Sequence, residues 1–183
     1  MKKRLLFIHS AGTQEAPEGS NDLVAHLRDA PGADYEVLHP MMPDPELPQY
    51  ARWKAKLETE LAALNGEVIL AGHSLGGSVL LKYLSEETFE RPIAGLFVIA
   101  SPSWGKNADW QVNEFVLRED LAATLPPIPK IFLYHSRDDE EVPFAHLAHY
   151  AEKIPDAIVR ELDGYGHLFS AGLPELADDI KRL

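Results

Sequence analysis

A serine flanked by glycines follows a short apolar segment near the middle of the chain. Residues 68–71 read Val-Ile-Leu-Ala, residues 72–77 read Gly-His-Ser-Leu-Gly-Gly, and helix-forming residues follow. Gly-x-Ser-x-Gly between a strand and a helix is typical of a sharp turn that exposes a nucleophilic serine. Side chains at positions 72 and 76 would collide with the adjacent backbone in such a turn, which explains the glycines. The pattern predicts that Ser74 is a nucleophile and that the Leu75 amide faces a developing oxyanion.

A serine hydroxyl needs a general base, because it is a poor nucleophile at neutral pH. In hydrolases with this strand–turn–helix motif the chain order is serine, then acid, then histidine. His167 is the candidate base, because it follows the last predicted strand in the stretch Gly-Tyr-Gly-His. The acid is expected after the preceding strand, where residues 135–143 carry four carboxylates. Asp138 and Asp139 are both candidates there, and residue types alone do not choose between them.

An oxyanion hole needs a second backbone amide, which in such folds comes from a loop after a strand beside the nucleophile strand. Residues 9–12 read His-Ser-Ala-Gly, so the N–H of Ser10 or of Ala11 is the expected donor. Trp104 and Trp110 lie in a long segment that follows another predicted strand. These two indoles either line the acyl pocket or pack against the body of the protein without touching substrate.

Short apolar runs alternate with helix-like segments along the chain. Strands are expected at 5–9, 35–38, 67–71, 94–100, 130–135 and 157–162, and helices from about 20 and at 50–64, 75–85, 113–123, 144–154 and 174–183. This alternation predicts parallel βαβ units. The candidate site residues all follow predicted strand ends, and the carboxyl ends of parallel strands share one edge of a sheet. We therefore expect these residues to converge at that edge.

Length, charge and composition narrow the class of protein. The 183 residues contain no linker-like tract, so we expect a single domain, 1–183, with a small cap or insertion at 101–129. Seventeen basic and 29 acidic residues give a net charge of −12, which disfavours nucleic acid and anionic membranes as partners. No cysteine is present, so thiol chemistry is excluded and a cytoplasmic location is expected. No cofactor and no metal are expected, because His146 and His149 have no further ligand at helical spacing; nothing indicates the oligomeric state.

The chain resembles the small serine hydrolases related to retinoblastoma-binding protein 9 and the bacterial YdeN proteins. The similarity covers nearly the whole length and includes Gly-His-Ser-Leu-Gly, Asp-Asp-x-x-Val-Pro at 138–143 and Gly-His-Leu-Phe at 166–169. The resemblance implies a compact α/β-hydrolase, with about six mostly parallel strands in the order 2-1-3-4-5-6 and helices on both faces. It also implies that the acid is the aspartate four residues before the proline, Asp139. A Leu-x-Cys-x-Glu segment is missing, so retinoblastoma binding is not expected here.

The predicted function is hydrolysis of small carboxylic esters through an acyl-enzyme, with Ser74, His167 and Asp139 as the triad. The modest size of the 101–129 segment favours short acyl groups. Two alternatives stay open. The bond cleaved is instead a thioester or an amide, or the fold acts mainly as a protein-binding module whose site is weak or vestigial.

Overall fold

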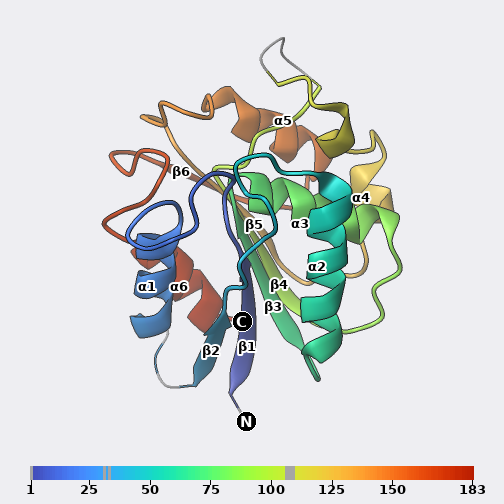
Figure 1. The fold of residues 1–183 in the computed structure, drawn as a ribbon, viewed down its shortest axis with the longest axis horizontal. Coiled ribbons are helices and arrows are strands. Elements are labelled where there is room, and N and C mark those ends of the chain that lie inside the picture. Colours follow the sequence, from blue (N-terminus) through green and yellow to red (C-terminus); the bar gives the residue numbers. More distant parts are fainter. Residues whose placement is uncertain (1, 31, 33, 106–109) are drawn as a thin grey trace.

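A parallel sheet lies at the centre of the computed structural model, which describes residues 2–30, 32, 34–105 and 110–183 (Figure 1). The strands are β1 (Lys3–Ile8), β2 (Tyr35–Leu38), β3 (Val68–His73), β4 (Ile93–Ile99), β5 (Ile131–Ser136) and β6 (Ile158–Leu162). The helices are α1 (Asn21–Asp29), α2 (Tyr50–Ala63), α3 (Leu75–Glu86), α4 (Leu121–Thr124), α5 (Ala145–Lys153) and α6 (Pro174–Lys181), with a short 3₁₀ helix η1 (Asn113–Phe115).

The strand order is β2-β1-β3-β4-β5-β6, and neighbouring strands run parallel. This order, with helices on both faces, confirms the expected fold class. From β1 the sheet extends to β2 on one side, and to β3 and the later strands on the other side. Such a reversal leaves a crevice beyond the carboxyl ends of the two central strands, where α/β proteins place their ligands.

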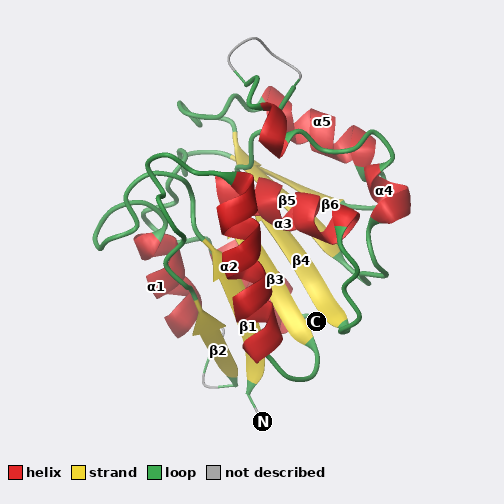
Figure 2. Ribbon diagram, turned by 45° about the vertical axis from the view of Figure 1, so that its right-hand side comes forward, coloured by secondary structure: helices red, strands yellow, loops and turns green. Residues whose placement is uncertain are grey.

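Alternate side chains of the central strands pack on opposite faces of the sheet. Leu6 and Ile8 of β1 join the apolar core that contains residues of α2, α3 and α5. Leu5 and Phe7 join the core formed with α1 and α6. Figure 1 shows α1 and α6 together on one side, and Figure 2 shows α2 and α3 in front of the sheet. Because both faces are covered, the central strands β3 and β4 are continuous apolar runs, whereas the edge strand β6 alternates.

Helix α3, which begins directly after the predicted nucleophile, is almost entirely buried. Ten of its twelve residues are buried, which matches a sequence that is apolar all round rather than amphipathic. Only Ser74 lies between the last residue of β3 and the first residue of α3. The sheet and this helix therefore fix the position of that serine from both sides.

The prediction of one helix over 113–123 is wrong. The structure has η1 at Asn113–Phe115 and α4 at Leu121–Thr124, with extended backbone at Val116 between them. Phe115 and Leu117 are both buried. Residues two apart point to different sides of a helix but to the same side of an extended chain, so burial of both favours the extended form.

The loops that follow the strands gather at the carboxyl edge of the sheet, at the top in Figure 1. The long segment 101–129 lies between β4 and β5 and contains η1 and α4. Within the part of the chain that the structure describes, no helix is both long and apolar enough to cross a bilayer.

Candidate active site

Ser74 occupies a strained turn between β3 and α3. Its backbone angles are φ 53° and ψ −123°, a region that non-glycine residues rarely adopt. The Ser74 amide donates a hydrogen bond of 2.8 Å to the carbonyl oxygen of Ile99, which ties the turn to β4. The strand–turn–helix arrangement expected from the sequence is therefore present.

The two glycines of the motif permit close contact between backbones. A Cβ atom on Gly72 would lie 2.5 Å from the carbonyl carbon of Gly76 and the amide nitrogen of Gly77. A Cβ atom on Gly76 would lie 2.2 Å from the carbonyl oxygen of Ile8 in β1. Backbone atoms cannot rotate away as a side chain can, so only glycine fits at either position.

His167 is paired with a buried carboxylate. Its Nδ1 lies 2.8 Å from Oδ2 of Asp139, whose side chain is fully buried. The amides of Glu141 and Val142 donate to the other oxygen of Asp139, at 2.9 and 2.8 Å. An ionised carboxylate only accepts hydrogen bonds, so Nδ1 of His167 carries the proton in this contact and Nε2 is left as the basic nitrogen.

The pKa of Asp139 reflects two opposing effects. Burial alone would raise it, but hydrogen bonds from His135 and His167 outweigh burial and hold the pKa well below its usual range. The Nε2 atom of His135 lies 3.1 Å from Oδ2 of Asp139. Asp139 is therefore a carboxylate throughout the neutral pH range, and His135 is a second partner that the sequence did not reveal.

Asp138 has a different environment from its neighbour. Its carboxylate accepts hydrogen bonds from the amides of Gly164 and Gly166, at 2.9 and 3.2 Å, and from the Ser136 hydroxyl. The hydrogen bond from Ser136 is the main reason that the pKa of Asp138 is lowered. Asp138 thus holds the loop that carries His167, whereas Asp139 contacts the imidazole itself.

His73 links two loops behind the site, a connection that the sequence analysis missed. Its Nε2 lies 2.8 Å from the carbonyl oxygen of His167, and its Nδ1 lies 2.9 Å from Oγ of Ser20. A carbonyl only accepts, so Nε2 carries the proton and the Ser20 hydroxyl donates to Nδ1. Burial, and next the neighbouring His167, lower the pKa of His73 to about 3. No local sequence signal distinguishes this histidine from an ordinary residue inside the motif.

The expected oxyanion loop presents three successive amides. The Ser10 amide donates to Oγ of Ser20 at 3.1 Å, and the Gly12 amide donates to the carbonyl oxygen of Pro45 at 2.8 Å. The expectation that Ser10 could supply the second donor is therefore disfavoured, because its N–H is already engaged. Among the described residues the Ala11 amide has no such acceptor. Leu75 is the first residue of α3, and its amide has no acceptor inside the helix.

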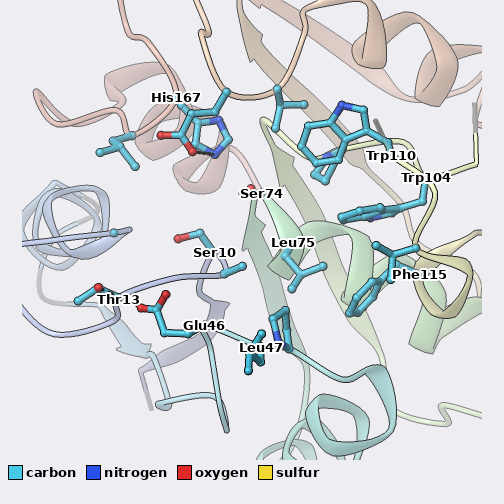
Figure 3. A pocket seen from close by; sticks show the side chains of 18 of the residues that line it. Ser10, Thr13, Glu46, Leu47, Ser74, Leu75, Trp104, Trp110, Phe115 and His167 are labelled. Atoms are coloured by element: carbon cyan, nitrogen blue, oxygen red, sulfur yellow. Dashed lines mark hydrogen bonds and ion pairs between the residues drawn. The ribbon is translucent and has the colours of Figure 1, made fainter. Parts of the chain in front are cut away.

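A cavity of about 990 Å³ opens at this edge of the sheet and joins the predicted site residues (Figure 3). Ser74, His167, Leu75, Ser10 and Ala11 all line it. Its walls are completed by segments that are distant in sequence, at 13–19, at 46–49 and after β4. The residues predicted from strand ends therefore do converge on one cavity.

Trp104 and Trp110 lie in the wall of that cavity rather than elsewhere on the body of the protein. Their ring centroids are 5.1 Å apart in an edge-to-face arrangement, and Trp104 lies 5.3 Å from the ring of Phe115. The amide of Gly105 donates to the carbonyl oxygen of Trp110 at 2.7 Å. Together the three rings form an apolar wall, here called the aromatic wall.

One of the two histidines considered as metal ligands contacts the backbone of the segment after β4. The Nδ1 atom of His146 accepts a hydrogen bond of 2.7 Å from the Ser103 amide. Within residues 2–30, 32, 34–105 and 110–183, no group of three or more His, Asp or Glu side chains is arranged to hold a metal ion.

Comparison with known sequences places the chain in a group of hydrolases. A family model described as serine hydrolase matches residues 24–177. A curated Bacillus subtilis protein named as a YdeN hydrolase is 24% identical over 139 residues, which is 75% of this chain and 72% of that protein.

Solved structures show the same fold. The Bacillus subtilis ydeN gene product has a TM-score of 0.79 at 20% identity, covering 99% of this chain and 98% of that one. Est1E from Butyrivibrio proteoclasticus has a TM-score of 0.70 at 16% identity, covering 99% and 86%. A meta-cleavage product hydrolase from Pseudomonas fluorescens has a TM-score of 0.73 at 13% identity, covering 98% and 88%. At these identities the likeness concerns the fold.

The contact between Gly76 and β1 makes a first prediction. The Gly76→Ala variant should lose about 3 kcal/mol or more of unfolding free energy, because its Cβ would overlap the Ile8 carbonyl oxygen. Urea unfolding followed by circular dichroism measures this loss. Gly95→Ala is the matched control, because a Cβ there would meet Leu183 side-chain atoms at 3.0 Å, which can move. Equal stabilities of the two variants would contradict the steric explanation.

The buried His73 makes a second prediction, on acid stability. Its pKa is about 3 in the folded protein and 6.5 when unperturbed, so below pH 6.5 the unfolded chain binds the extra proton. The contribution of His73 to the free energy of unfolding is constant above pH 6.5. Below pH 6.5 that free energy should fall by about 1.4 kcal/mol for each pH unit. His9 and His146 act in the same direction, because burial lowers the pKa of each to about 4.

Urea unfolding at pH 7, 6, 5 and 4 tests this with His73→Gln as the comparison. The variant lacks one titrating group, so its stability should fall less steeply than that of the wild type below pH 6. Parallel stability curves for the two proteins would show that His73 does not stay neutral in the folded state.

Proposed function

The chain belongs to the serine hydrolase family, and on that premise we propose that it cleaves carboxylic esters with Ser74 as the nucleophile. The observation that carries this proposal is the buried pairing of His167 Nδ1 with Asp139, at 2.8 Å, on the wall of the cavity that also contains Ser74. That pairing leaves Nε2 as the nitrogen without a proton, which is what a general base for a serine requires.

Acylation begins when Ser74 Oγ attacks the ester carbonyl carbon and His167 Nε2 takes the hydroxyl proton. The carbonyl electron pair moves to oxygen, and the resulting anion accepts hydrogen bonds from the amides of Leu75 and Ala11. Each such donor contributes roughly 10²- to 10³-fold to the rate. The intermediate then collapses, the bond to the alcohol oxygen breaks, and the alcohol leaves with the proton from Nε2.

Deacylation repeats these steps with water as the nucleophile. His167 Nε2 takes a proton from water as the water oxygen attacks the acyl carbon. The bond between that carbon and Ser74 Oγ then breaks, Nε2 returns the proton to Oγ, and the carboxylic acid leaves. Asp139 remains ionised and stabilises the imidazolium in both halves of the reaction. The lowered pKa of Asp139 supports this role, because the carboxylate has no tendency to take the proton at neutral pH.

The aromatic wall supports an acyl group larger than the short acyl groups that the modest size of the 101–129 segment led us to expect. Trp104, Trp110 and Phe115 line a cavity of about 990 Å³ together with Ser74. Aromatic surfaces of this kind bury a flat or branched apolar group with a large gain from desolvation. We propose that the substrate carries an aryl or branched acyl group on this side of the serine. We also propose that the enzyme acts in the cytoplasm.

Substitution of the proposed triad tests the function. Ser74→Ala should lower kcat for a p-nitrophenyl ester by about 10⁴-fold or more, because the acyl-enzyme cannot form. Asp139→Asn should lower kcat by about 10⁴-fold, because an amide does not fix the imidazole tautomer or stabilise its cation.

Asp138→Asn is the matched control for the acid. It should cost far less activity than Asp139→Asn, because Asp138 holds the 164–166 loop and does not touch the imidazole. Equal losses in the two variants would remove the assignment of Asp139. Full activity of Ser74→Ala would contradict the proposed function. A folded wild type without turnover on esters, thioesters or amides would favour the alternative of a protein-binding module.

A further inference from the structure

Glu141 places a negative charge beside the proposed base. Its Oε2 atom lies 3.7 Å from Nε2 of His167, the nitrogen that must exchange protons with substrate. The Glu141 side chain is 64% exposed and lines the cavity. Its backbone amide donates to Asp139, so the loop that supplies the acid also fixes the backbone of Glu141.

The rest of the cavity carries charge of the same sign. Glu18, Glu46 and Glu114 also line it, and none of its described lining residues is Lys or Arg. Glu114 accepts a hydrogen bond from the Tyr50 amide, and Glu46 accepts one from the Thr13 hydroxyl. Among the described residues, no Lys or Arg side chain forms an ion pair with any of these glutamates. Within the part of the chain that the structure describes, no ion pair with Lys or Arg therefore offsets the charge of these glutamates.

One of the acidic lining residues, Glu46, lies across the nucleophile from the aromatic wall. Figure 3 shows Ser74 between Trp104, Trp110 and Phe115 on one side and Ser10, Thr13 and Glu46 on the other. A leaving group must approach Nε2 of His167 to receive its proton, so it must also pass close to Glu141. An acyl group directed toward the aromatic wall leaves the opposite side, which contains Glu46 and is here called the acidic side, for the alcohol.

We propose that Glu141 is a specificity-determining residue that selects esters whose leaving alcohol carries a positive charge. This inference rests on the proposed ester hydrolysis and adds the chemistry of the leaving group. A cation on the alcohol is attracted to the Glu141 carboxylate and to the acidic side of the cavity. An anionic alcohol is repelled there, and a neutral one gains no electrostatic attraction.

Two isosteric esters of one aryl acid test the proposal, the choline ester and the 3,3-dimethylbutyl ester. They differ by a quaternary nitrogen in place of a carbon, so shape and chemistry at the ester are matched and the charge does not titrate. The wild type should show a kcat/KM about 10-fold higher for the choline ester at low ionic strength. The preference should decline as sodium chloride is raised to about 0.5 M, because salt screens exposed charges.

Glu141→Gln should lower that preference about 3- to 5-fold, in line with the modest strength of an exposed charge pair. The preference is the ratio of the kcat/KM values for the two esters, so a change that affects both esters equally does not alter it. Glu140→Gln is the matched control. It removes the same charge from an exposed neighbouring residue that does not line the cavity, and should leave the preference unchanged.

The outcomes separate this inference from the function on which it rests. Cleavage of both esters at equal kcat/KM by the wild type, or an undiminished preference in Glu141→Gln, overturns the role of Glu141 and leaves the esterase proposal intact. An equal loss of preference in Glu140→Gln also overturns it, because the effect would then come from net charge. Cleavage of neither ester contradicts the proposed function, and the inference fails with it.

Discussion

The backbone of Ser74 is the constraint on which the rest of the site depends. A non-glycine residue at φ 53° costs on the order of 1–3 kcal/mol and persists only when its surroundings impose it. Here the surroundings are β3 on one side and the buried helix α3 on the other, with α3 pressed against the Ile8 carbonyl of β1. Because this contact leaves no room for a Cβ at Gly76, the turn, the helix and the first strand fix one another. The hydroxyl and the Leu75 amide gain their positions from the core of the fold.

The other loops of the site are held by buried polar groups rather than by apolar packing. Asp139 is ionised and accepts from two backbone amides and two imidazoles, whereas His73 is neutral and bridges the Ser20 hydroxyl and the His167 carbonyl. Through Ser20 the same network reaches the Ser10 amide. One connected set of hydrogen bonds therefore sets the positions of the base and of the loop that offers the Ala11 amide. A fully satisfied network of this kind favours a single arrangement of the loops.

Much of the fold could be predicted from the sequence, because it depends on local patterns. Apolar runs between helix-like segments locate the strands, and the glycine-flanked serine locates the turn. The helix expected at 113–123 failed because burial of Phe115 and Leu117 depends on neighbours distant in sequence. The same limit applies to the site. Adjacent aspartates have the same chemistry in a sequence, and only the family resemblance favoured Asp139. The three-dimensional contacts show that Asp139 meets His167 while Asp138 meets the Gly164 amide. The positions of His73 and Glu141 likewise follow from loops that meet only in the folded chain.

The most direct test of the central claim is the intact mass of the protein after incubation with a fluorophosphonate at neutral pH. Such a probe reacts with a serine that an adjacent base has activated, whatever the natural substrate. We predict a single adduct that peptide mapping places on Ser74 and that is absent from the folded Ser74→Ala protein. No adduct on the wild type, or an adduct that persists in Ser74→Ala, would contradict the claim that Ser74 and His167 form a working nucleophile and base.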